Sequence, residues 1–83
     1  MKYGEGDIVL TRSLAGEGIP QTHVRLCERV VVPQDGSWGG YSGWHAEVVY
    51  EEEALALRKY SIPLRVGDLT FVYDDCIIKK EQS

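Results

Sequence analysis

Three large aromatic side chains, Trp38, Tyr41 and Trp44, are separated only by glycine and serine. Such rings can stack on a base, a sugar, a proline-rich peptide or an alkylated ammonium group. The structural alternative is that Trp44 caps the core, Trp38 crosses an exposed sheet edge and Tyr41 is solvated at a hairpin tip. Because exposed aromatic rings are costly unless something covers them, we expect a binding surface here. His45 and Glu47 are its expected flanking polar groups.

A second candidate surface consists of arginine side chains. Arg25 and Arg29 would point the same way along a regular strand. With two further arginines they form an alternative nucleic-acid face: Arg12, Arg25, Arg29 and Arg65. However, nine Lys and Arg stand against thirteen Asp and Glu, which gives a net charge of −4. An acidic chain repels a phosphate backbone at long range, so nucleic-acid binding is open but disfavoured.

The histidines and cysteines do not suggest a metal site. His23 and Cys27 are four residues apart on one expected strand, so about 13 Å separates them and they cannot share an ion. His45 is expected to be an unliganded surface residue. Cys27 and Cys76 lack the C-x-x-C spacing, and we expect free thiols with no metal and no cofactor.

Residues 1–20 contain no apolar stretch typical of a signal peptide. No apolar run approaches the roughly 18 residues that a membrane span needs. We therefore expect a cytoplasmic protein without a membrane partner.

The elements that must position these side chains are mostly strands. Five segments have strand character, either as short β-branched and aliphatic runs or by alternation of apolar and polar residues. They predict strands at residues 7–12, 23–32, 44–50, 69–73 and 76–78. Residues 51–60 predict one short helix, because good helix formers follow three acids and precede Arg58 and Lys59. Glu28 interrupts the apolar face of the second strand, which indicates either a β-bulge or a strand that runs past the core.

The whole chain, residues 1–83, is long enough for one small domain only. Its short strands, with Gly6-Asp7 before the first, a glycine-rich hairpin and a single short helix, resemble the small SH3-like barrels, which include KOW and Tudor modules. The resemblance implies a mostly-β, five-stranded SH3-like barrel that binds proteins, peptides or nucleic acid through loops and an open face. Fold analogy alone does not choose among these ligands.

Two enzyme families resemble the opening segment from Gly6 to Arg12. In MazF-type toxin ribonucleases the similarity stops after this strand, because no Arg-Pro pair follows here. The NlpC/P60 hydrolases also resemble Thr22-His23-Val24, but their cysteine nucleophile begins a helix. Cys76 instead precedes a strand-like segment. We therefore expect a non-enzymatic module that binds a protein or peptide, with nucleic-acid binding as the alternative and a small hydrolase or ribonuclease as the second alternative.

Overall fold

The computed structural model describes residues 3–12, 18–36 and 39–81. Its elements follow one another as β1 (Ile8–Thr11), β2 (Thr22–Val32), β3 (Tyr41–Val48), α1 (Glu51–Lys59), β4 (Leu69–Tyr73), the 3-10 helix η1 (Asp74–Cys76) and β5 (Ile77–Lys80). The prediction of a mostly-β protein with five strands and one short α-helix is confirmed.

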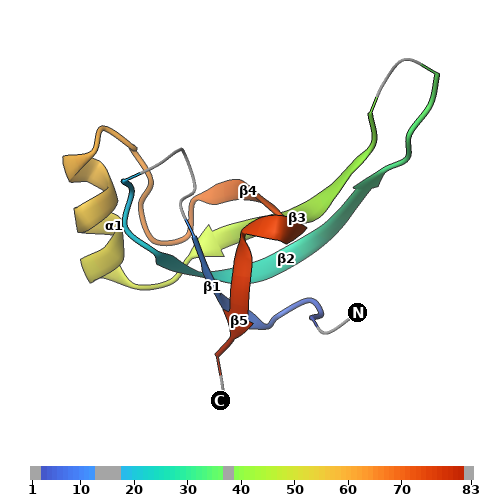
Figure 1. The fold of residues 1–83 in the computed structure, drawn as a ribbon. Helices are drawn as coiled ribbons and strands as arrows, with labels where there is room; N and C mark the ends of the chain where they lie inside the picture. The colour runs from blue at the N-terminus through green and yellow to red at the C-terminus, as the bar shows by residue number, and fades with distance from the viewer. Residues whose placement is uncertain (1–2, 13–17, 37–38, 82–83) are drawn as a thin grey trace.

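The strands form one antiparallel sheet in the order β4-β3-β2-β1-β5. β4 and β5 lie at its two ends, and no strand pairing within the described ranges closes it into a barrel. The hairpin of β2 and β3 extends away from the rest of the sheet, and α1 lies at the opposite end (Figure 1).

β3 begins earlier than the sequence predicted. The expected first residue was Trp44, but the strand starts at Tyr41. Ser42 and Gly43, expected in a loop, pair with β2 on one side. Gly43 also pairs with β4 on the other side. Glycine has low strand propensity, so pairing with two neighbouring strands determines this boundary.

The last strand begins one residue later than the sequence predicted. Cys76 was expected in it but belongs to η1, and β5 runs from Ile77 to Lys80. The backbone N–H of Arg12 donates to the carbonyl of Cys76 at 2.8 Å, which ties η1 to the end of β1.

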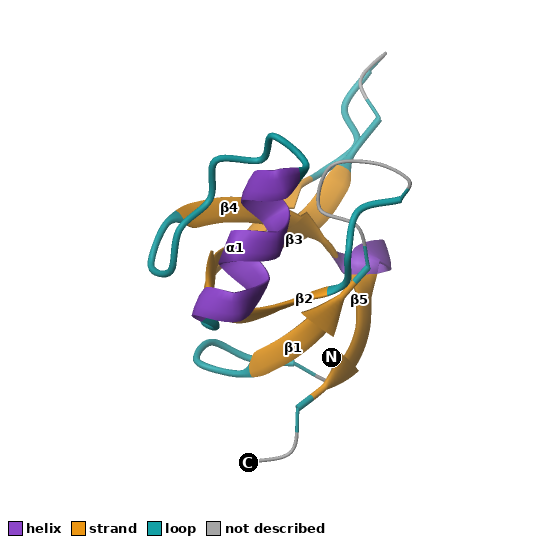
Figure 2. Cartoon of the chain, turned by 90° about the vertical axis from the view of Figure 1, so that its left-hand side faces the viewer, coloured by secondary structure: helices purple, strands orange, loops and turns teal. Residues whose placement is uncertain are grey.

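One face of the sheet, here called the inner face, carries the main core. Its buried side chains come from all five strands: Val9, Val24, Leu26, Trp44, Ala46, Val72 and Ile77. At one end of this face Ala54 and Leu57 of α1 pack against Val48 in a second cluster, and Figure 2 shows the helix lying across the sheet there. The opposite face is called the outer face.

Helix α1 ends one residue before the predicted limit, at Lys59. Ser61 adopts a left-handed conformation with φ 66°. Its N–H donates to the carbonyl of Arg58, and the N–H of Ile62 donates to that of Leu57, both at 3.1 Å. These two bonds form a Schellman motif with serine where glycine is usual. No helix of the described segments is long and apolar enough to cross a membrane.

Candidate functional site

Aromatic side chains gather around Phe71 on the outer face. The ring centroids of Phe71 and Tyr73 are 4.8 Å apart, and those of Phe71 and Tyr41 are 5.7 Å apart. His45 contacts Phe71 at 6.0 Å, and Tyr41 contacts Tyr73 at 6.0 Å. All four contacts are edge-to-face, a favourable geometry for aromatic pairs. We call Tyr41, His45, Phe71 and Tyr73 the aromatic cluster.

Gly43 makes the room that this cluster needs. It pairs with Tyr73 in the ladder between β3 and β4. A Cβ at this position would collide with the carbonyl oxygen of Val72 and would lie 2.6 Å from Cζ of Phe71. The Phe71 ring therefore occupies space that any other residue at position 43 would fill, and close packing explains the glycine.

The cluster is open to solvent. Tyr41 is 46% exposed and Tyr73 is 51% exposed, while Leu69 on the same face is 63% exposed. The partners of Trp44 and Ala46 on β4 are the smaller Val72 and Thr70, which face inward. β4 thus presents Leu69 and Tyr73 to solvent with the half-buried Phe71 between them. A contiguous exposed apolar patch indicates an interaction site.

The predicted binding residues divide between the two faces. Tyr41, His45 and Glu47 lie on the outer face. Trp44 is only 3% exposed and belongs to the main core, so its expected place in an exposed aromatic platform is corrected. Tyr41 and Trp44 are an odd number of positions apart in one strand, and such residues point to opposite faces. Trp38 lies outside the described residues.

Phe71 and Tyr73 were not among the predicted site residues. The sequence showed that Leu69, Phe71 and Tyr73 share one face of a strand. Alternation does not show which face is covered, however. Only the pairing of Trp44 with Val72 identifies the inner side of β4.

The bulge that Glu28 indicated is present. The register between β2 and β3 shifts between Leu26 and Glu28, so Cys27 is the extra residue. Glu28 is thereby directed to the outer face, opposite His45, and Arg29 to the inner face, opposite Trp44. The bulge removes the apparent exception without burying a carboxylate.

The bulge also separates two arginines that were expected to point the same way. Arg25 is opposite Glu47 on the outer face, and their side chains form an ion pair of 2.5 Å. Arg29 lies on the other face, so the four candidate arginines do not share one face. Arg12 and Arg65 are exposed, and nucleic-acid binding stays an untested prediction.

Arg29 instead joins a polar network at the base of the long hairpin. Its guanidinium donates to both carboxylate oxygens of Asp74, at 2.6 and 3.0 Å, and Ser42 donates to Asp74 at 2.6 Å. The hydrogen bonds from Arg29 hold the pKa of Asp74 below its usual value; partial burial opposes this shift and Ser42 adds to it. The guanidinium carbon also lies 5.2 Å from the Trp44 ring centroid, a cation–π contact.

The buried indole N–H of Trp44 has no hydrogen-bond partner within the described structure. It nevertheless lies close enough to Asp74 to favour the charged carboxylate.

His23 connects three parts of the chain. Its Nδ1 lies 2.8 Å from Glu53 of α1, and its Nε2 lies 3.2 Å from Glu81 after β5. The backbone N–H of His23 also donates to Glu53, at 2.8 Å. Both ring nitrogens therefore contact carboxylates, and His23 links α1 to the sheet.

Both cysteines are free thiols. Cys76 packs against the main core, whereas the ring of His23 is held by Glu53 and Glu81. The two residues do not form the thiol–imidazole pair that a cysteine hydrolase needs. Within the described ranges, no three His, Cys, Asp or Glu side chains are grouped so that they could hold a metal ion.

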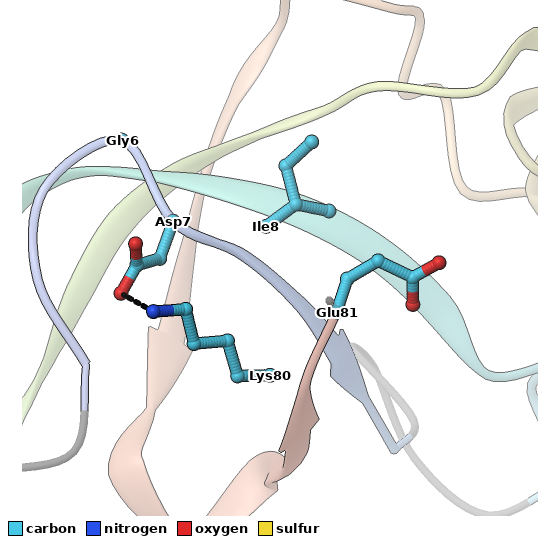
Figure 3. Close-up of a pocket in the computed structure, with 5 residues that line it drawn as sticks. All are labelled: Gly6, Asp7, Ile8, Lys80 and Glu81. Carbon is cyan, nitrogen blue, oxygen red and sulfur yellow. Dashed lines mark ion pairs between the residues drawn. The ribbon is translucent and has the colours of Figure 1, made fainter. Parts of the chain in front are cut away.

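A shallow pocket lies where β1 begins and β5 ends (Figure 3). Its volume is about 210 Å³, smaller than the roughly 300 Å³ at which ligand sites usually begin. Lys80 Nζ lies 3.5 Å from Asp7 Oδ2 across it, and the third charged lining residue, Glu81, pairs with His23. None of the predicted site residues lines this pocket, and the aromatic cluster is the better candidate site.

Comparison of the chain with family models, with curated proteins and with solved structures finds no match.

Proposed function

We propose that this chain is a non-enzymatic interaction module that binds a protein or peptide segment at the outer face of β3 and β4. The observation that carries the proposal is the exposed aromatic cluster. Tyr41 and Tyr73 keep about half of their surface in solvent although each ring is positioned by Phe71. Rigid aromatic side chains lose little entropy on binding and are enriched at interfaces.

The edge position of β4 supports an extended ligand. β4 reads Leu-Thr-Phe-Val-Tyr, without a charged residue or proline, and pairs with β3 without a register shift. The opposite edge strand, β5, carries Lys79 and Lys80. Lysine on an edge strand disfavours pairing with another chain, whereas an uncharged apolar edge strand favours such pairing. A peptide could therefore add as a further strand beside β4 and place its side chains against the aromatic cluster.

An SH3-like barrel remains the architectural part of the proposal. It is supported by the five-stranded antiparallel sheet and the single short α-helix.

Selection from a phage-displayed library of random peptides tests the function. Wild-type protein should enrich a set of related peptides, and the Tyr41→Ser/Tyr73→Ser variant should lose them. The matched control is Leu55→Ser/Tyr60→Ser on and just after α1, because these side chains are 48% and 52% exposed, against 46% and 51% for the tyrosines. The control should retain the same peptides.

Circular dichroism establishes first that every variant folds. If the tyrosine variant unfolds, the less disruptive Tyr73→Ser alone replaces it, because Tyr73 is the more exposed of the two rings. Failure to enrich any peptide family, or equal binding by wild-type and tyrosine-variant protein, would overturn the proposed function.

A further inference from the structure

We propose that the ligand of the outer face is a basic peptide segment, in which Arg or Lys side chains alternate with apolar ones. This inference rests on the proposed function and adds the charge of the partner. It is carried by the distribution of carboxylates and cations around the aromatic cluster.

Glu28 is the first of these carboxylates. The bulge at Cys27 places it on the outer face directly opposite His45, whose ring contacts Phe71. Neighbouring strands are about 4.8 Å apart, so Glu28 lies about 10 Å from Phe71 along the same row. Glu28 is exposed, and no cation of the described chain lies within ion-pair distance of its carboxylate. Its charge is available to a ligand.

Two more acids lie beside the bulge. Partial burial, followed by the carboxylates of Glu47 and Glu5, raises the pKa of Cys27, and Arg25 opposes them. In the ladder, Glu47 lies opposite Arg25, two residues before Cys27. Arg25 forms an ion pair with Glu47, and among the described residues no cation lies within ion-pair distance of Glu5 or Glu28.

Of the other basic residues, Arg29 donates to the carbonyl of Gly43 at 3.2 Å but lies on the inner face, where it is paired with Asp74. Lys79 and Lys80 belong to β5, which β1 and β2 separate from β3. Arg65 precedes Leu69, at the end of β4 opposite Tyr73. The surface beside the cluster is therefore negatively charged on the β2 side, at Glu28. On the other side, β4 is an uncharged edge strand.

A basic extended segment matches this arrangement. Alternate side chains of an added strand point to the outer face, where an Arg or Lys can lie over the rings of Tyr41 and Tyr73. Its long side chain can also reach toward Glu28. Acidic segments would meet like charge, and complementary charge across an interface sets partner choice.

Nuclear magnetic resonance titration with three synthetic peptides tests the inference. The probes are decapeptides that alternate valine with arginine, glutamine or glutamate. The arginine peptide should bind about tenfold more tightly than the glutamine peptide at about 0.05 M NaCl, and this preference should largely disappear at about 0.5 M NaCl. Amide signals of Leu69–Tyr73 should shift, since these residues form the strand that the peptide joins.

Glu28→Gln should weaken the arginine peptide about two- to fivefold and leave the glutamine peptide unchanged. The matched control is Glu52→Gln, an equal change of net charge at an exposed position in the first turn of α1, which should alter neither. Tyr41→Ser/Tyr73→Ser should weaken both peptides.

The outcomes separate the two proposals. Equal binding of the arginine and glutamine peptides, both sensitive to the tyrosine substitutions, would overturn the charge inference and leave the proposed function standing. If the arginine peptide binds wild-type protein and the Tyr41→Ser/Tyr73→Ser variant equally well, its binding is only long-range electrostatic attraction. That result would overturn the inference. A self-associated dimer that excludes every peptide, or preference for a single-stranded oligonucleotide over the arginine peptide, would overturn both.

Discussion

Arg29 and Asp74 are joined by two parallel hydrogen bonds of 2.6 and 3.0 Å between β2 and η1. They are 45 residues apart in the sequence, and the bond connects the base of the long hairpin to the corner between β4 and β5. The pair lies on the inner side of the sheet, whereas the aromatic cluster lies on the outer side.

Removing the charge of Asp74 should destabilise the fold. Asp74→Asn should lower the free energy of unfolding by about 1–3 kcal/mol, because it leaves the partly buried Arg29 without its charged acceptor. Urea denaturation followed by circular dichroism measures this. Asp75→Asn is the matched control, since Asp75 is exposed and lies next to Asp74 in η1. Equal loss in the two variants would contradict this role for the pair.

The same pair predicts a dependence on acid. The pKa of Asp74 is lowered in the folded protein, chiefly by hydrogen bonding from Arg29. Its contribution is therefore fully present above the pKa of an unfolded aspartate, about 3.9, and is lost as the pH falls through the lower folded value. The difference in free energy of unfolding between wild type and Asp74→Asn should be constant near neutral pH. It should shrink toward zero below about pH 4, and a difference that persists in acid would exclude the linkage.

The sequence was sufficient to predict five strands and one short helix, because these follow from local propensity, alternation and charge. Glu28 on an otherwise apolar face indicated either a bulge or a strand that runs past the core, and the register shows a bulge, at Cys27. The consequence for Arg29 was missed. An extra residue reverses the facing of every later position in a strand, and the sequence could not fix where that residue lies.

The division of the aromatic residues also depends on distant contacts. Gly43 looked like a loop residue, yet it lies within β3 where the ring of Phe71 packs over it. Because the sequence predicted that the third strand begins at Trp44, Tyr41 was expected outside it. The alternation of side chains along a strand could therefore not be applied to Tyr41 and Trp44. Their opposite facing follows only from the pairing with β2 and β4.

Gly43→Ala should destabilise the protein by about 1–3 kcal/mol or more, because the new methyl group collides with backbone and with the Phe71 ring. The matched control is Gly39→Ala, where an added Cβ meets nothing within 4 Å. Thermal unfolding of the two variants compares them. The Gly43 variant should also lose the upfield ring-current shifts of the aromatic cluster, and a melting temperature equal to that of the Gly39 variant would contradict the packing argument.

The thiol of Cys27 should react slowly with alkylating reagents at neutral pH. Partial burial, Glu47 and Glu5 raise its pKa, while Arg25 acts in the opposite direction. Because the thiolate is the reactive form, alkylation of Cys27 in a Cys76→Ser background should reach half its maximal rate above about pH 8.5, the midpoint of an unperturbed thiol. Glu47→Gln should lower that midpoint, since it removes a carboxylate and releases Arg25 from its ion pair, whereas Glu52→Gln on α1 should leave it unchanged. A midpoint that fails to move in the Glu47 variant would contradict the role of this carboxylate in raising the pKa of Cys27.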